Sequence, residues 1–193
     1  MVNGSLIFLR IGWFSNVIVA SVILASCDGD AGQVGGPKPP PPVIQQVGWL
    51  MHSDSTYGFA VRYPNDDVIL KESTLPIPAQ PPAVLRLRFQ QKNIAAGQFA
   101  DLEPPRFTIQ VFTRSSGHSL RNWLHSVGLL PPGSEVSIVQ LAGASEGLRV
   151  GLRQQLAPNE FVYFATGKYV YCLIPFGPES ADMLASFRLI GRP

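Results

Sequence analysis

The sequence feature that most restricts the fold is a pair of apolar runs at residues 161–175, which read FVYFATGKYVYCLIP. The two runs are separated by the short turn Thr166–Lys168. Runs rich in Val, Tyr and Phe favour strands, and a short connection between two such runs favours an antiparallel pair. We therefore predict a β-hairpin here.

Other segments alternate between apolar and polar residues with the period of two that is typical of strands. In GFAVRYP (58–64), Phe59, Val61 and Tyr63 fall on one face and Arg62 on the other. Pro64 is predicted to end this strand, because proline cannot donate to a strand ladder. Further strands are predicted at 48–52, 83–90, 106–113, 135–142 and 148–156.

Two segments have the periodicity of helices instead. In 119–128 (SLRNWLHSVG), apolar residues recur at i, i+3, i+4 and i+7 from Leu120. Ser119 suits an N-cap and Gly128 suits the helix end. The second predicted helix, 178–190, has apolar residues on one side. Hairpin-linked strands with one helix inside the series and one closing it predict an α+β fold, in which helices cover an antiparallel β-sheet.

The order of these segments resembles that of PsbP-like proteins over nearly all of residues 48–190. The motifs that carry the resemblance are GFAVRYP, SLRNWL, YVYCLIP and MLASFRLI, in that order along the chain. The resemblance implies the Mog1/PsbP-like αβα sandwich. This family includes the PsbP subunit of photosystem II and many bacterial lipoproteins, and it is not known for a shared catalytic site. The resemblance therefore implies a non-catalytic domain and supplies no catalytic residues.

The N-terminal segment 1–26 has the features of a signal peptide. An apolar stretch, Ile11–Ala25, follows Arg10 and is shorter than the roughly 20 residues that a membrane-spanning helix needs. It ends in Leu-Ala-Ser-Cys, which resembles the lipobox of bacterial lipoproteins. We predict that Cys27 carries a diacylglycerol thioether and palmitate and becomes the first residue of the mature chain. The alternative is an N-terminal anchor helix with an incidental cysteine.

Residues 27–46 are rich in glycine and proline and are predicted to link this lipid to a domain at 47–193. The glycines favour flexibility, whereas PKPPPP favours a stiff polyproline helix. Fully extended, the linker spans at most roughly 60 Å, at about 3.3 Å per residue. The alternative role for the proline run is a docking site for a proline-binding partner.

The lipobox predicts the location of the protein. Two or three acyl chains on one cysteine give stable anchoring, because each buried CH₂ contributes about 0.8 kcal/mol. We expect the chain on the extracytoplasmic face of a cell membrane, attached through its N-terminal lipid. Asp28 follows the cysteine, and in Gram-negative bacteria an acid there favours retention on the inner membrane.

The charge of the chain argues against nucleic acid as a partner. Charged residues make up 15% of the sequence and the net charge is +2, whereas nucleic-acid binding needs a concentrated basic surface. A smaller basic patch of outward-facing arginines remains possible, suited to anionic headgroups or an acidic partner. The arginines concerned are Arg86, Arg88, Arg149 and Arg153. The alternative is that these arginines increase solubility and protect strand edges from pairing with other chains.

Residues 143–147 (GASEG) match the G-x-S-x-G pattern around the serine nucleophile of α/β-hydrolases. That serine requires a strand–turn–helix context and a histidine later in the chain. Here the motif lies between two predicted strands, and all three histidines precede Ser145. We interpret 143–147 as a turn and predict no catalytic residue.

The remaining candidates for chemistry are few. His118 and His125 lack the spacing and further ligands of a zinc site and are predicted to lie at the surface. Asp66 and Asp67 lack the spacing of an EF-hand and are predicted to form a solvated turn. Cys172, within the last apolar run, is predicted to be a small buried residue without a disulfide. We expect no metal and no cofactor.

These observations predict a membrane-anchored extracytoplasmic lipoprotein whose domain binds a ligand or assists the assembly of a membrane protein complex. It is not expected to be an enzyme. Two alternatives remain open. One is a cell-envelope hydrolase that uses Ser145 or the Asp66–Asp67 region, and the other is a structural or stress-related surface lipoprotein.

Overall fold

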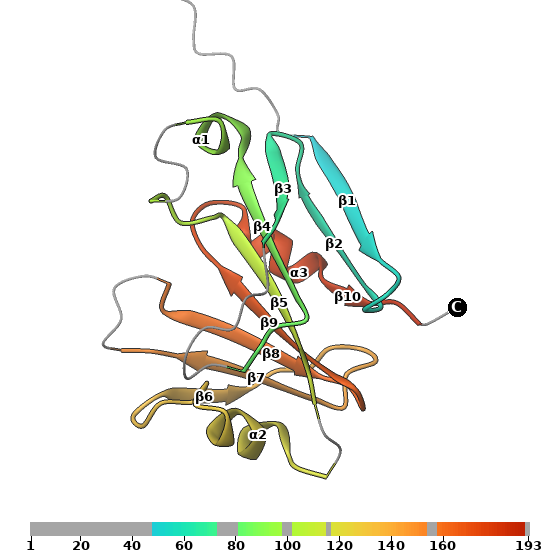
Figure 1. The fold of residues 1–193 in the computed structure, drawn as a ribbon, viewed down its shortest axis with the longest axis vertical. Helices are drawn as coiled ribbons and strands as arrows, with labels where there is room; N and C mark the ends of the chain where they lie inside the picture. Colours follow the sequence, from blue (N-terminus) through green and yellow to red (C-terminus); the bar gives the residue numbers. More distant parts are fainter. Residues whose placement is uncertain (1–47, 73–80, 98–101, 115–116, 154–157, 192–193) are drawn as a thin grey trace, which may run out of the picture. The chain divides into compact units, whose positions relative to one another are not determined.

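The domain is built on a seven-stranded antiparallel sheet with the strand order β3-β4-β5-β9-β8-β7-β6 (Figure 1). Its strands are β3 (Asp67–Lys71), β4 (Leu85–Gln91), β5 (Phe107–Thr113), β6 (Glu135–Ile138), β7 (Glu146–Gly151), β8 (Glu160–Ala165) and β9 (Tyr169–Pro175). A second antiparallel sheet, ordered β1-β2-β10, consists of β1 (Trp49–Asp54), β2 (Phe59–Pro64) and β10 (Arg188–Leu189). The helices are α1 (Lys92–Ala95), α2 (Leu120–Ser126) and α3 (Ser180–Ser186).

This computed structural model describes residues 48–72, 81–97, 102–114, 117–153 and 158–191. All of them belong to one compact unit, Ile44–Pro193. The predictions for the signal peptide, for Cys27 and for the linker at 27–46 therefore lie outside the described residues. Within the described residues, no helix has the length and apolar character needed to cross a bilayer.

The predicted hairpin at 161–175 forms the middle of the large sheet as β8 and β9. Phe164 pairs with Tyr171 on one face, and Tyr163 pairs with Cys172 on the other. All four side chains are at most 5% exposed. The two runs are continuously apolar, rather than alternating, because both faces of these strands are covered.

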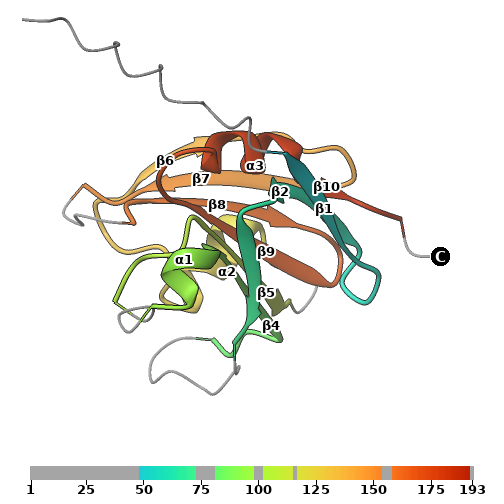
Figure 2. The ribbon, with the colours of Figure 1, turned by 90° about the horizontal axis from the view of Figure 1, so that it is seen from above.

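The two faces of the large sheet contribute to two separate hydrophobic clusters. One cluster contains Phe164 and Tyr171 and is covered by the small sheet and by Met183 and Phe187, which lie in and just after α3. The other contains Tyr163 and Cys172 and is covered by the apolar side of α2. Since Tyr163 and Phe164 are adjacent and point to opposite faces, α2 and α3 lie on opposite sides of the sheet (Figure 2).

The sequence predictions for fold class and for the two longer helices are confirmed. An antiparallel sheet is covered by helices, as expected. Ser119 caps α2 by accepting a hydrogen bond from the Asn122 backbone N–H at 3.3 Å. Gly128 follows the helix end with a φ of 76°, a conformation that favours glycine.

Several predicted boundaries are wrong. The prediction of a solvated turn at Asp66–Asp67 fails for Asp67, which begins β3 and is 3% exposed. The predicted helix 178–190 ends at Ser186, and Arg188–Leu189 pair with β2 as β10 instead. The strand predicted at 135–142 ends at Ile138. Partners distant in the sequence decide these ends, and a local pattern does not contain them.

Candidate functional site

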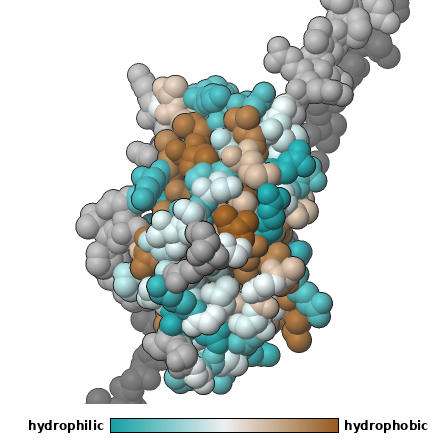
Figure 3. Space-filling model, turned by 90° about the vertical axis from the view of Figure 1, so that its right-hand side faces the viewer, coloured by the Kyte–Doolittle hydropathy of each residue, from teal (hydrophilic) through white to brown (hydrophobic). Residues whose placement is uncertain are grey.

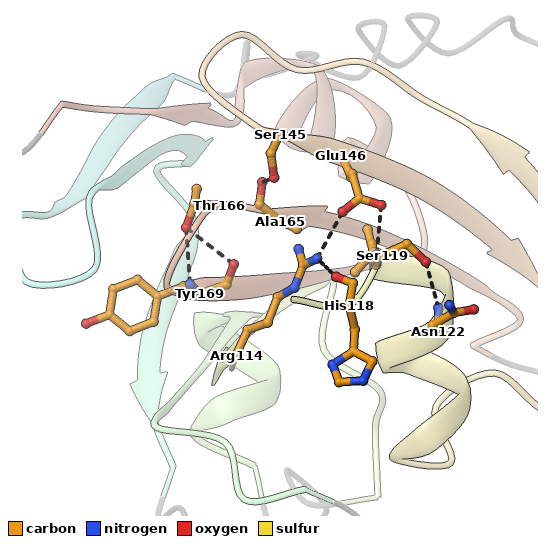
Figure 4. Close-up of polar contacts among 10 residues, drawn as sticks. Arg114, His118, Ser119, Asn122, Ser145, Glu146, Ala165, Thr166 and Tyr169 are labelled. Carbon is orange, nitrogen blue, oxygen red and sulfur yellow. Dashed lines mark hydrogen bonds and ion pairs between the residues drawn. The ribbon is translucent and has the colours of Figure 1, made fainter. Parts of the chain in front are cut away.

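The GASEG segment connects strands rather than forming a nucleophile elbow. The Ser145 hydroxyl donates a hydrogen bond to the Ala165 carbonyl at 3.1 Å, and the Ser145 backbone N–H donates to the same oxygen at 2.8 Å. The His118 ring points away from Ser145 (Figure 4). These contacts hold the β6–β7 connection against the end of β8, and they do not form a catalytic triad.

Glu146, the residue after this serine, joins β7 to the start of α2. Its carboxylate accepts hydrogen bonds from Arg114 Nη2 at 2.9 Å and from the Leu120 backbone N–H at 2.7 Å (Figure 4). The same arginine donates to the His118 carbonyl. A carboxylate at exposed N–H groups of a first helical turn is favourable. The acid in GASEG therefore has a structural task that the motif alone did not indicate.

The other candidates from the sequence are surface or core residues. His118 and His125 are exposed, as predicted. Within the described segments, no group of three or more His, Cys, Asp or Glu is arranged to hold a metal ion. Cys172 is buried and free, and burial raises the pKa of its thiol to about 12. A thiol with so high a pKa is a poor nucleophile, which agrees with the predicted packing role.

The four arginines considered as a basic patch do not form one. Arg86 and Arg88 lie on β4 and share Glu72, at 3.6 and 2.9 Å. Arg149 on β7 pairs with Glu160 at 3.3 Å, and Arg153 pairs with Glu135. Strands β5, β9 and β8 separate β4 from β7, and nearby acids offset each charge. This part of the surface therefore presents no concentrated positive charge.

An ion cluster, not predicted from the sequence, surrounds the buried Arg106, which directly precedes β5. The guanidinium is 6% exposed, and it lies 3.3 Å from Asp66 and 3.2 Å from Asp67 through Nη1. Its Nε lies 3.5 Å from Glu179 Oε2. We call these four residues the Arg106 cluster. One positive charge therefore faces three carboxylates.

Two members of the Arg106 cluster are in unfavourable states. The Asp67 side chain is fully buried, and beyond its ion pair with Arg106 neither of its oxygens accepts a hydrogen bond from the described residues. Burial raises the pKa of Asp67 to about 6, and Arg106 limits the rise. Glu179, the N-cap of α3, has a φ of 60°, and it is the single non-glycine residue with positive φ among the residues described. Such buried charge and backbone strain concentrate at functional sites or at demanding structural junctions.

One concave feature lies between the β1–β2 turn, the β8–β9 turn and the residues around β10. Its volume is about 440 Å³, within the range of small-molecule sites. The walls are three tyrosine rings, and the polar residues Thr166 and Lys168 come from the β8–β9 turn. We call it the tyrosine hollow. Its lining residues are Tyr57, Gly58, Gly143, Thr166, Gly167, Lys168, Tyr169, Tyr171, Leu189, Ile190 and Gly191.

The aromatic wall of the tyrosine hollow is held in place by backbone contacts. Tyr57 and Tyr169 meet edge to face with centroids 5.4 Å apart. The Tyr57 hydroxyl donates to the Val84 carbonyl at 3.0 Å, and the Tyr171 hydroxyl donates to the Tyr57 carbonyl at 2.6 Å. Tyr171 and Tyr169 belong to the buried core, at 2% and 9% exposure, so the ring that a ligand can reach is chiefly the partly exposed Tyr57.

Lys168 supplies positive charge at the rim of the tyrosine hollow. Its ammonium lies 5.1 Å from the centroid of the Tyr169 ring, and within the described chain it has no carboxylate in an ion pair. Gly58, with a φ of 66°, lets the β1–β2 turn approach the Ile190 carbonyl. The tyrosine wall beside the Lys168 ammonium suits a ligand that has an apolar group and a nearby negative charge. The sequence predicted the β9 strand that carries Tyr169 and Tyr171, but it did not predict that the β1–β2 turn lies against the β8–β9 turn.

Comparisons with known proteins give structural neighbours and no sequence relative. No family model matches the chain, and no curated protein matches it. It is similar to the solution structure of cyanobacterial PsbP (CyanoP) from Synechocystis sp. PCC 6803, with a TM-score of 0.40 and 13% identity, covering 80% of this chain and 99% of that one. It is also similar to the crystal structure of the Ran-binding protein Mog1p from Saccharomyces cerevisiae, with a TM-score of 0.37 and 12% identity, covering 75% and 97%.

These two neighbours are the PsbP and Mog1 proteins whose fold the sequence resemblance named. At such low identities and TM-scores, they provide no argument about a ligand, a partner or an activity of this chain. The antiparallel α+β architecture is established by its own strands and helices.

Proposed function

We propose that this protein is a lipid-anchored, extracytoplasmic binding domain whose recognition site is the tyrosine hollow. The observation that carries the proposal is the hollow itself, where the partly exposed Tyr57 and the edges of two buried tyrosines lie beside Lys168, an ammonium without an ion pair in the described part of the chain. Its ligand is an aromatic or aliphatic group that carries an anion. The ring wall contributes buried apolar area, and Lys168 orients the negative end.

The binding proposal is tested with anilinonaphthalene sulfonate, an aromatic anion whose fluorescence rises in an apolar site. Reversing the charge in Lys168→Glu weakens binding of this probe by about tenfold, equivalent to about 1.4 kcal/mol. The matched control is Lys71→Glu, because Lys71 is an exposed lysine of β3 at the edge of the large sheet. Equal probe affinity in the two variants would rule out the hollow as the site.

The anchor part of the proposal rests on the Leu-Ala-Ser-Cys sequence that ends at Cys27. We expect metabolic labelling with palmitate to mark the wild-type protein and to be lost in Cys27→Ser. Cys172→Ser is the matched control and retains the label, since Cys172 is buried in the domain. Labelling that persists in Cys27→Ser contradicts the anchor and leaves the hollow to be judged by the probe.

A hydrolase is the weaker candidate. Its serine, Ser145, donates its hydroxyl to a backbone carbonyl, and the His118 ring points elsewhere. The Asp66–Asp67 region, the second candidate for hydrolysis, is bound to Arg106. These contacts favour a structural explanation for both groups. Binding therefore accounts for more of the observed geometry than hydrolysis does.

A further inference from the structure

The outer face of the small sheet carries a row of aromatic, apolar and basic residues. In the β1–β2 register Met51 lies opposite Arg62, so both point to the same face, and Trp49 shares that face two residues earlier. Arg188 of β10 pairs with Ala60 and joins the row. We call Trp49, Met51, Arg62 and Arg188 the β1 stripe.

The arginines of the β1 stripe are held by apolar partners instead of acids. The Arg62 guanidinium lies 5.5 Å from the centroid of the Trp49 ring, and Arg188 Nη2 lies 3.2 Å from the Met51 sulfur. Neither is in an ion pair within the described ranges. Of the seven other described arginines, Arg121 likewise has no ion pair in this part of the chain, and six have a carboxylate within ion-pair distance: Arg86, Arg88, Arg106, Arg114, Arg149 and Arg153.

The stripe therefore presents two positive charges that no ion pair compensates, next to exposed apolar surface. Met51 is 51% exposed on the face of the stripe, whereas its neighbour Leu50, 47% exposed, points to the opposite face of the edge strand β1. Asp182 lines a hollow of about 310 Å³ together with Trp49 and Arg62, which makes it the acid on this face. Figure 3 shows the side of the domain that carries β1, with apolar residues grouped between polar ones.

A surface that combines tryptophan, exposed apolar side chains and unpaired arginines suits the headgroup region of a bilayer. Tryptophan prefers that region, and each arginine near an anionic surface contributes about 1 kcal/mol. Arginine also buries its aliphatic part along apolar surface while its charge stays in the polar layer.

The position of the stripe in the chain supports the same occupant. Trp49 opens the first described strand, and the sequence before it leads back to Cys27. A lipid at that cysteine would keep the stripe close to the bilayer at a high effective concentration, so weak contacts suffice. This argument rests on the proposed lipid anchor.

We propose that the β1 stripe seats the domain on anionic phospholipid headgroups. Arg62 and Arg188 bind the phosphates, and Trp49 and Met51 contact the interface between headgroups and acyl chains. Leu189, the residue after Arg188, lines the tyrosine hollow, so the stripe and the hollow adjoin at β10.

The test uses the full processed protein, reconstituted in vesicles of phosphatidylcholine or of an equal mixture with phosphatidylglycerol. An environment-sensitive thiol fluorophore is attached in Met51→Cys. The matched control is Ile138→Cys, because Ile138 is 83% exposed and lies in β6, at an edge of the large sheet. Cys172 is buried and does not compete for the label.

We expect the emission from residue 51 to shift to the blue in the anionic vesicles and not in phosphatidylcholine alone. The label at residue 138 shows no such shift. The shift is lost when Arg62→Gln and Arg188→Gln are added, and it falls with added salt, which screens exposed charges. Equal emission in both vesicles, or a shift that survives the arginine substitutions, overturns the proposal.

Failure of the anchor is detected separately, by the reactivity of Cys27 in the protein that lacks introduced cysteines. An acylated Cys27 takes up no fluorophore, whereas a free thiol there shows that the anchor is absent. The emission from residue 51 is read in excess vesicles in either case. It therefore decides whether the stripe binds the anionic surface, whatever the fate of the anchor.

Discussion

Two arginine environments on this domain are opposites. Arg106 is buried and lies within 3.5 Å of three carboxylates, whereas Arg62 is exposed, lies over the Trp49 ring and has no ion pair with a described acid. The two sites include residues that are close in the sequence. Arg62 lies in β2, and Asp66, which pairs with Arg106, follows the end of β2. The same residue type thus has two different tasks.

The difference lies in what happens to the charge. At Arg106 the guanidinium has given up water, and its carboxylates replace the lost hydration, so removing one partner leaves buried charge without compensation. At Arg62 water remains, and the aromatic ring orients the guanidinium without neutralising it. We therefore expect the stability of the fold to depend on the first site and the proposed binding to an anionic surface to depend on the second.

The largest effect is expected from Arg106→Met. This change leaves the buried Asp67 beside Asp66 and Glu179 with no cation from β5, and it should lower the free energy of unfolding by about 3–5 kcal/mol. Urea denaturation measures the loss. Adding Asp67→Asn should recover part of it, since the neutral amide needs no cation. A loss below about 1 kcal/mol would contradict the distinction between the two arginines.

The pH dependence of Asp67 should give the next largest effect. Its folded-state pKa is raised to about 6, because burial outweighs the attraction of Arg106 and is reinforced by Asp66 and Glu179. Its stabilising contribution is therefore complete below about pH 4 and is lost as the pH rises through about 6.

Relative to Asp67→Asn, the wild type should therefore lose about 3 kcal/mol of unfolding free energy between about pH 4 and pH 7. The measurement is a series of urea denaturations of both proteins across this range. The difference between them removes the titrations that they share. A difference that stays constant with pH would show that Asp67 is not raised by burial.

A smaller effect is expected from the strained backbone at Glu179. Glycine accepts a φ of 60° without steric cost, so Glu179→Gly should be more stable than Glu179→Gln by about 1 kcal/mol. Both variants remove the carboxylate near Arg106, and the comparison isolates the strain. Thermal denaturation of the two variants measures this difference in stability. Equal midpoints would show that the backbone at residue 179 is not strained.

The smallest effect on stability is expected from Arg62→Gln combined with Arg188→Gln. Both arginines are exposed, and surface changes of this kind usually alter the unfolding free energy by less than about 0.5 kcal/mol. The free energy of unfolding from urea titrations tests this directly. A loss comparable to that of Arg106→Met would mean that the β1 stripe stabilises the fold.

The sequence predicted the elements whose partners are close or whose periodicity is clear. The β8–β9 hairpin and α2 follow from their own residues, since Thr166–Lys168 makes a short turn and Ser119 caps its own helix. The prediction for 178–190 was correct for α3 and wrong for β10. Arg188–Leu189 form a strand because β2 is there to pair with them, and their own sequence continues a helical pattern.

The sites were harder to predict than the elements. Asp67 looked like part of a polar turn, because a pair of aspartates after a proline usually is solvated. It is buried because Arg106 and Glu179, far away in the sequence, reach the same point. The tyrosine hollow likewise needs two turns and the residues around β10 to meet, and no local pattern contains that meeting.

The sequence by itself determined the strand and helix periodicities, the α+β class and the prediction of Cys27 as a lipid attachment point. These depend on residues that are neighbours in the chain. The tertiary structure alone decided which arginines are neutralised, which tyrosines line one hollow and why Ser145 is held by Ala165. Those properties depend on the distance and the solvent between side chains, which are fixed only when the two sheets and their helices pack together.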